Sequence, residues 1–192
     1  MARRIVIIQG HPDPAGGHFG HALADRYATG AEAAGHEVRR IEVARLEFPL
    51  LRTKDDFETG EPPEAIRRAQ EDVAWGEHLV LLYPLWLGTM PALLKGFLEQ
   101  VFRAPFAFGN SPQRREKRLE GRSARIVVTM GMPAVVYRWI FRAHSLRSLE
   151  RNVLSFCGIR PSRESLVGLV EGSPRARARW LARMERLGRA AR

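Results

Sequence analysis

The chain has 192 residues, which is enough for one α/β domain spanning 1–192 and too few for two domains of ordinary size. Its hydrophobic content of 45% and charged content of 27% are typical of a globular protein with a substantial core. The net charge of +10, concentrated after residue 110, is compatible with an anionic partner or with an arginine-rich solvated surface. The one cysteine, Cys157, excludes an internal disulfide framework and a multi-cysteine zinc site, and it favours a reducing, cytoplasmic location.

Apolar runs and amphipathic segments alternate from the first residues to the last. Short runs rich in β-branched residues and leucine predict buried parallel strands at 4–9, 38–43, 78–83, 125–130 and 164–169. Apolar residues at helical spacing predict helices at 19–34, 63–76, 90–101 and from 174 onward, with Thr89 and Ser173 as N-caps, and residues 134–157 are expected to be mostly helical. Segments 44–62 and 104–122 are predicted to be irregular. Five strands with crossover helices predict a doubly wound parallel sheet with helices on both faces.

Two segments bear on targeting, and the charge distribution bears on partners. The apolar run 5–8 is too short for the core of a signal peptide. The longest apolar stretch, 79–94, is interrupted by Pro84, Gly88 and Pro91, so no membrane span is expected. The basic C-terminal half has no recognisable nucleic-acid motif and no interleaved aromatic platform, so no nucleic-acid partner is expected.

Ligands of doubly wound sheets bind at the carboxyl ends of the strands, so the loops there hold the candidate functional residues. Neither G-x-G-x-x-G nor G-K-S/T occurs, which argues against a Rossmann dehydrogenase and a P-loop NTPase, and G-x-S-x-G is absent too. The loop after the first predicted strand combines His11 with Gly16 and Gly17 directly before a helix, as in a phosphate-binding nest; a glycine-rich turn with surface histidines is the alternative. The loop after the third predicted strand carries Trp86, which indicates either a wall for a flat ligand or a plug of the core.

One motif in the middle of the chain is specific enough to indicate a family. The run Pro84-Leu-x-x-x-x-x-Pro-Ala-x-Leu-Lys-Gly-Phe97, followed by Val101-Phe102 and Phe106-Ala-Phe108, resembles the flavodoxin-like NAD(P)H:quinone oxidoreductases of the DT-diaphorase and modulator-of-drug-activity type. The opening strand-Gly-His loop and the Thr-x-Gly turn after the fourth predicted strand follow in the order of that family, and the resemblance covers about residues 3–145. It implies a flavodoxin-like, doubly wound five-stranded parallel sheet in the order 2-1-3-4-5.

The resemblance also implies a function and a set of site residues. It implies a flavin, FMN or alternatively FAD, with NAD(P)H as co-substrate and two-electron hydride transfer through the flavin to a quinone or similar acceptor. Tyr137 and His144 are implied as catalytic residues on the flavin face. The implied cofactor-binding residues are His11, Gly17, His18, Phe19, Pro84, Leu85, Trp86, Leu87, Gly88, Met130, Gly131 and Met132.

The chain departs from the family pattern at two of these loops. Trp86 follows Pro84 by two residues, where the family has three, and the turn Thr129-Met-Gly-Met132 lacks one of the family's two glycines. An alternative function is therefore kept, a non-catalytic flavin-binding regulatory or ancillary subunit, since relatives of this fold serve potassium-efflux systems. The net charge of +10 argues against an electron carrier, which would typically be acidic.

Two further expectations concern metals and assembly. His18 and His21 stand three residues apart, but no carboxylate or cysteine at matching spacing accompanies them, so no metal site is expected. The family builds its sites at homodimer interfaces, and the apolar stretch 135–141 is the expected interface of a homodimer.

Overall fold

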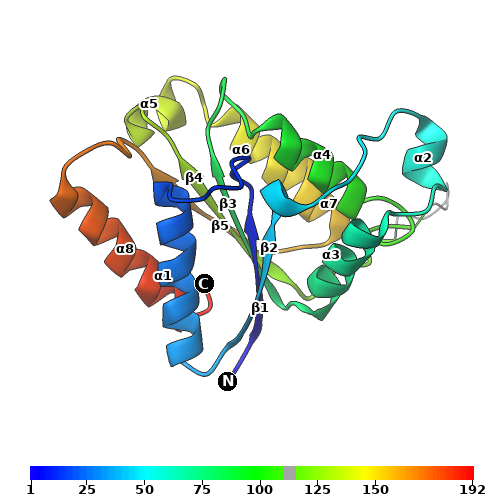
Figure 1. Cartoon of the computed structure of the whole chain (residues 1–192), viewed down its shortest axis with the longest axis horizontal. Coiled ribbons are helices and arrows are strands. Elements are labelled where there is room, and N and C mark those ends of the chain that lie inside the picture. Colours follow the sequence, from blue (N-terminus) through cyan, green and yellow to red (C-terminus); the bar gives the residue numbers. More distant parts are fainter. Residues whose placement is uncertain (110–115) are drawn as a thin grey trace.

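The computed structural model describes residues 1–109 and 116–192. Its centre is a five-stranded, all-parallel sheet in the order β2-β1-β3-β4-β5, with helices on both faces (Figure 1). The predicted doubly wound α/β fold and its strand order are confirmed. The strands are β1 (Arg4–Gln9), β2 (Glu37–Glu42), β3 (His78–Pro84), β4 (Ser123–Thr129) and β5 (Ser162–Val167).

The helices form two layers around this sheet (Figure 1). On one face lie α1 (Phe19–Ala33) and α8 (Pro174–Arg189), and on the other lie α3 (Glu64–Trp75), α4 (Ala92–Val101) and α6 (His144–Ser148). The shorter helical segments are α2 (Lys54–Glu58), α5 (Ala134–Trp139), α7 (Ser155–Cys157), the 3-10 turn η1 (Val43–Arg45) and the π-helical segment η2 (Leu149–Leu154).

The side chains of β1 divide the core between the two helical layers. Val6 and Ile8 pack on the side of α3 and α4, whereas Ile5 and Ile7 pack on the side of α1 and α8, because successive strand residues point to opposite faces. Since both faces are buried, the central strands are continuous apolar runs, which made them recognisable in the sequence.

Helices α1 and α8 approach each other backbone to backbone. A Cβ atom at Gly30 would lie 2.0 Å from the main-chain oxygen of Glu185, and one at Gly188 would lie 2.0 Å from that of Tyr27. Only glycine leaves room for this contact. It holds α8, the basic last helix, directly against the helix that begins at the first strand-end loop.

Two local predictions are wrong. Segment 44–62 is not wholly irregular: it contains part of η1 and the whole of α2, whose first turn is closed by a reciprocal capping box between Thr53 and Asp56. Thr89 does not cap α4, since the N-cap position is taken by Pro91. Residues 134–157 are mostly helical, as predicted, in the four segments α5, α6, η2 and α7. Part of the predicted irregular segment 104–122 lies outside the described residues.

Hydrogen bonds between main-chain groups continue past the strand ends at the carboxyl edge of the sheet. The N–H of Gly10 donates to Leu82 at 2.7 Å, that of Leu85 to Thr129 at 2.7 Å, and that of Met130 to Val167 at 2.9 Å. The loops after β1, β3 and β4 therefore start from one rigid edge. Within residues 1–109 and 116–192, no helix has the length and apolar character needed to cross a membrane.

Candidate active site

Three loops meet at the carboxyl edge of the sheet. We call residues 10–18, after β1, the first loop; residues 85–91, after β3, the second loop; and residues 130–133, after β4, the third loop. The ring of His11 in the first loop lies edge-on to Trp86 in the second, with 6.1 Å between ring centroids. The third loop is next to the second, because Leu85 is bonded to Thr129 at its start.

The first loop holds a cluster of histidine rings. His11 stacks on His18 with 3.9 Å between ring centroids, and His21 in the first turn of α1 lies 5.3 Å from His11. Burial, together with the neighbouring His18 and His21, lowers the pKa of His11 to about 4, so His11 is neutral at neutral pH. His18 lies 2.7 Å from the carboxylate of Asp13. An anion at this loop would therefore be bound by main-chain groups more than by charged imidazoles.

The N-terminus of α1 offers such main-chain groups. No side chain caps its first turn, so the first N–H groups of the helix keep their hydrogen-bonding capacity. Gly17 adopts a left-handed conformation with φ of +77°, and a Cβ atom at Gly17 or Gly20 would meet no atom within 4 Å. Phe19 lies beside this opening, and the guanidinium of Arg177 from α8 covers its ring at 4.8 Å.

The second loop is a tight two-residue turn. Trp86 and Thr89 exchange main-chain hydrogen bonds of 2.8 and 3.0 Å around Leu87 and Gly88, which have φ of 47° and 80° as a type I′ turn requires. The turn leaves Trp86 49% exposed and the side chain of Leu87 fully exposed. A leucine in a left-handed conformation is strained, and such residues cluster at functional sites. The turn therefore presents an apolar surface at the sheet edge.

The structure limits which main-chain donors of this second loop can reach a ligand. The N–H of Leu85 is bonded to Thr129 and that of Trp86 to Thr89, whereas Pro84 has none. Of the five residues predicted here, Leu87 and Gly88 keep donors available, and a Cβ atom at Gly88 would meet nothing within 4 Å.

The third loop is held from behind by the segment that follows β5. Met130 is buried, its N–H donates to Val167 at 2.9 Å, and its carbonyl accepts from Val170 at 3.3 Å. The carbonyl of Met132 accepts from Leu169 at 3.2 Å. Gly131, between the two methionines, is exposed with open space beside it. Gly131 is thus the exposed part of this loop, whereas Met130 is buried and bonded to the segment after β5.

Tyr137 and His144 have different surroundings. Tyr137 in α5 is only 1% exposed, and its hydroxyl is bonded to Ser145 Oγ at 2.7 Å and accepts from the N–H of Leu146 at 3.3 Å. His144 is exposed at the start of α6. The catalytic role of Tyr137 stays a prediction, and its placement favours a positioning role, because its hydroxyl faces α6 rather than the open edge.

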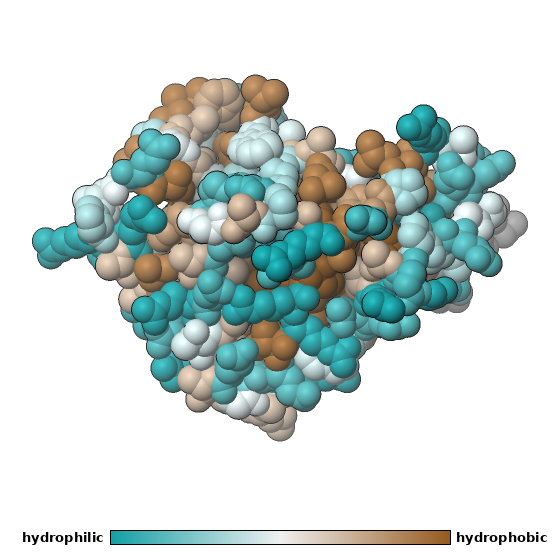
Figure 2. Space-filling model, in the orientation of Figure 1, coloured by the Kyte–Doolittle hydropathy of each residue, from teal (hydrophilic) through white to brown (hydrophobic). Residues whose placement is uncertain are grey.

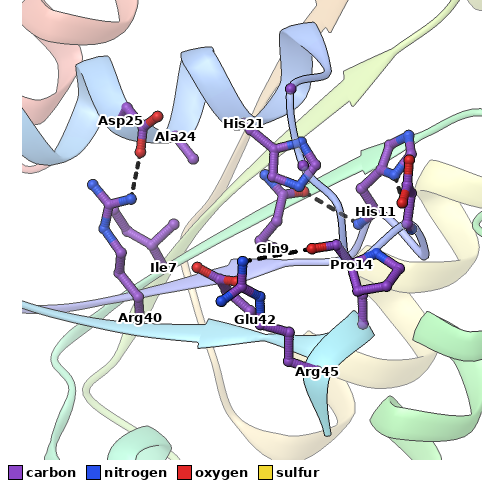
Figure 3. A pocket seen from close by; sticks show the side chains of 14 residues that line it. Ile7, Gln9, His11, Pro14, His21, Ala24, Asp25, Arg40, Glu42 and Arg45 are labelled. Atoms are coloured by element: carbon purple, nitrogen blue, oxygen red, sulfur yellow. Dashed lines mark hydrogen bonds and ion pairs between the residues drawn. The ribbon is translucent and has the colours of Figure 1, made fainter.

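A small cavity of about 130 Å³ lies behind the first loop, between α1 and β2 (Figure 3). Gln9 at the end of β1 accepts from the N–H of His11 at 3.2 Å, but its Nε2 is buried and has no hydrogen-bond partner among the described residues, and the same holds for Nδ1 of His21. Arg40 pairs with Asp25 at the far wall. No sequence pattern indicated Gln9, which has the position of an ordinary strand end, and His21 stood out in the sequence only as a possible metal ligand with His18. Both leave polar atoms free for a ligand or for water.

Comparison with known proteins agrees with this geometry. A family model described as having a flavodoxin-like fold matches residues 3–187. The chain belongs to this flavodoxin-like family. It is 25% identical over 158 residues to an uncharacterized NAD(P)H oxidoreductase of Haemophilus influenzae, covering 80% of this chain and 78% of that protein. The NAD(P)H:quinone oxidoreductase from Methanothermobacter marburgensis superposes with a TM-score of 0.82 at 23% identity, covering 98% of this chain and 96% of that one.

A second similar structure was solved with a bound cofactor. The FMN-dependent NADH-azoreductase from Bacillus anthracis, in complex with FMN, superposes with a TM-score of 0.73 at 14% identity, and the whole of both chains is covered. The resemblance to flavodoxin-like NAD(P)H:quinone oxidoreductases that the central motif predicts is thereby confirmed.

Proposed function

We propose that this chain is a flavin-dependent NAD(P)H:quinone oxidoreductase. The observation that carries the proposal is the convergence of three loops at one sheet edge, each with a glycine beside open space and one with an exposed Trp86–Leu87 turn. A flat apolar ring with a polar, phosphorylated tail fits this combination of surfaces. The relatives named as NAD(P)H oxidoreductases and as a quinone oxidoreductase support the same reaction class.

The proposed binding mode assigns one part of the flavin to each loop. The N-terminus of α1 and Gly17 hold the phosphate, the turn at Leu87 and Gly88 contacts the ring, and Gly131 contacts its far end. When bound, the flavin would supply the redox chemistry, which is transfer of a hydride from NAD(P)H and of two electrons to a quinone-like acceptor. The exposed imidazole of His144 is placed to hold a proton near the ring, and Tyr137 positions His144 through Ser145.

We propose FMN rather than FAD as the flavin. The first loop offers one helix N-terminus, which matches one phosphate group, and the azoreductase with the same fold is described as FMN-dependent. Calorimetric titration of the apoprotein with each flavin tests this choice. FMN should bind at least as tightly as FAD, and a clear preference for FAD would contradict it.

The binding mode is tested by a matched pair of glycine variants. Gly17 and Gly35 both adopt left-handed conformations, with φ of +77° and +79°, and both have open space where a Cβ atom would stand. Gly17 lies in the first loop, whereas Gly35 follows the other end of α1. Gly17→Ala and Gly35→Ala should each lower the free energy of unfolding by about 1–2 kcal/mol. FMN affinity, measured by quenching of flavin fluorescence, should fall at least about tenfold in Gly17→Ala alone. Equal affinities would contradict the binding mode.

We further propose that the protein is a homodimer. Large apolar side chains gather over α5 and beside the third loop (Figure 2). An exposed patch of this kind on a folded chain marks an interaction surface. The residues of this patch are Val135, Trp139, Ile140, Phe141 and Leu169, which are between 49% and 73% exposed.

Light scattering after size exclusion tests the dimer. The wild type should have the mass of two chains, and Trp139→Glu should have the mass of one, because a charge cannot be buried unpaired in an interface. Leu50→Glu is the control, since Leu50 is 61% exposed and lies outside the patch. A wild-type monomer at micromolar concentration would contradict the proposal.

We propose a cytoplasmic location for the same chain. Cys157 is 1% exposed, unpaired, and burial raises the pKa of its thiol to about 12. A lone, unpaired thiol suits a reducing compartment. Fractionation of the source cells should recover the protein in the cytosolic fraction, and recovery from a secreted or periplasmic fraction would contradict this proposal.

A further inference from the structure

A second cavity, of about 310 Å³, lies at the amino edge of the sheet, opposite the three loops. β3 and β4 begin there with His78 and Ser123, and Arg3 precedes β1. The two chain ends marked in Figure 1 lie toward this side of the molecule. The charged side chains that line the cavity are all arginines, namely Arg3, Arg160, Arg163 and Arg192. Part of the basic surplus of the C-terminal half is thus gathered in one place.

One ring nitrogen of a buried histidine in this cavity has no hydrogen-bond partner among the described residues. His78 is 2% exposed, and its Nε2 is buried with no hydrogen-bond partner among the described residues. Its Nδ1 lies 2.8 Å from Oγ of Ser123. Oγ of Ser123 already accepts a hydrogen bond from Arg3, so its own hydroxyl hydrogen is free to donate to Nδ1. In the tautomer in which Ser123 donates to Nδ1, the imidazole proton lies on Nε2, which is then a donor in need of an acceptor.

Burial, together with the neighbouring guanidinium groups, keeps His78 neutral. Burial lowers the pKa of His78 to about 3, and the charges of Arg3, Arg125 and Arg163 act in the same direction. Arg3 donates to neutral acceptors, which are the carbonyls of Glu77 and Ala191 and the hydroxyl of Ser123. The nearest carboxylate to these contacts is that of Glu77, which pairs with Arg4 and whose pKa is lowered mainly by a main-chain hydrogen bond from Arg4 and also by the charges of Arg4 and Arg3.

Arginines from β5 and the turn before it add to this charge. Within the described part of the chain, neither Arg160 nor Arg163 lies within 4 Å of a carboxylate side chain. Arg125 and the hydroxyl of Tyr27 both donate to the main-chain oxygen of Arg192. The charged side chains around the cavity are all arginines, so the cavity is cationic. A donor without an acceptor, beside two guanidinium groups with no carboxylate side chain within 4 Å among the described residues, is the complement of an oxyanion.

We propose that this cavity binds a small oxyanion of the phosphate class, held by Nε2 of His78 and by the guanidinium groups of Arg160 and Arg163. A phosphate group supplies acceptor oxygens for the imidazole and for several guanidinium donors at once. The bound anion links the starts of β3 and β4 to β5 and to the end of α8. The site lies at the edge of the sheet opposite the candidate flavin site, so it is independent of the proposed oxidoreductase function.

Titration with inorganic phosphate, followed by NMR of the histidine side-chain nitrogens at neutral pH, tests the proposal. The signals of His78, assigned with His78→Gln, should shift and saturate at or below millimolar phosphate, and the signals of His11 and His18 report separately on the first loop. Chloride at equal ionic strength is the reference. Shifts that do not saturate, or that chloride reproduces, would mean an adventitious ion only and would overturn the proposal.

Two arginine variants provide the matched comparison. Arg163→Gln removes a charge from the cavity wall, and Arg179→Gln removes one from the outer part of α8. Both residues are exposed, so both variants should fold. Phosphate affinity should fall at least about fivefold in Arg163→Gln and should not change in Arg179→Gln; equal affinities would overturn the proposal.

A lipid headgroup carries the same phosphate chemistry on a surface. Vesicles containing phosphatidylglycerol should therefore leave the His78 signals unchanged. A shift with vesicles and none with free phosphate would assign the cavity to a lipid and would overturn the small-anion proposal.

Discussion

Replacing Tyr137 by Phe separates a positioning role from a direct role in catalysis. The substitution removes a hydroxyl that bonds to Ser145 at 2.7 Å and accepts from the N–H of Leu146 at 3.3 Å in a nearly solvent-free position. Ser145 is half-buried and can turn to water, but the N–H of Leu146 loses its acceptor. An unsatisfied buried donor costs about 1–3 kcal/mol, so the free energy of unfolding should fall by about 2 kcal/mol. For a chain of this length, that loss corresponds to a fall in Tm of about 4–8 °C.

Tyr83→Phe is the control for this substitution. Tyr83 is also 1% exposed, but its hydroxyl has no hydrogen-bond partner among the described residues, so its removal should leave stability unchanged or slightly higher. Urea unfolding of the flavin-free chains, followed by tryptophan fluorescence, measures both values. Equal stabilities of the two variants would refute the hydrogen-bond reasoning.

Activity then shows which role Tyr137 has. If it positions His144, the folded Tyr137→Phe variant should keep the pH profile of quinone reduction seen in the wild type. Loss of one limb of that profile would instead assign the proton to Tyr137 itself.

Further predictions concern packing, thiol reactivity and acid stability. Gly30→Ala should lower the free energy of unfolding by about 1–3 kcal/mol, because its Cβ atom would lie 2.0 Å from the main chain of Glu185. Gly20→Ala is the control, because its Cβ atom would meet open space and should not lower stability. Equal urea midpoints of the two variants would contradict the close contact between α1 and α8. Cys157 should resist a disulfide reagent in the native chain and react fully in guanidinium, because burial raises its pKa to about 12; rapid native labelling would contradict that burial. The pKa of His78 is lowered to about 3, so the unfolded chain takes up its proton first, and stability should fall as pH drops below about 6.5, by up to about 1.4 kcal/mol per pH unit. The urea midpoint should depend less steeply on pH in His78→Gln than in the wild type. Identical slopes against pH would contradict the lowered pKa of His78.

The sequence predicted the sheet well because its strands are buried on both faces. β1 is found at the predicted residues, whereas β4 and β5 begin two residues earlier than predicted, at Ser123 and Ser162. Polar residues at a strand start break the apolar pattern, yet they still pair in the ladder, where Ser123 stands opposite His78. The pairing comes from neighbouring strands, which a local pattern does not contain.

The candidate site was predictable as a set of loops but not as a set of contacts. The motif around Pro84 located the second loop, but the bond from Leu85 to Thr129 depends on residues more than forty positions apart. The partners of Tyr137 lie beyond a chain reversal at Ala143, whose left-handed conformation no sequence pattern indicated. Threonine is a common helix N-cap, but Thr89 instead closes the turn by pairing with Trp86.

The most direct test of flavin-dependent catalysis is the visible absorption spectrum of the purified chain after incubation with FMN and desalting. The three loops at the sheet edge predict one retained flavin per chain, bleached by NAD(P)H and recoloured by a quinone. A chain that retains no flavin under these conditions would contradict the assignment of all three loops.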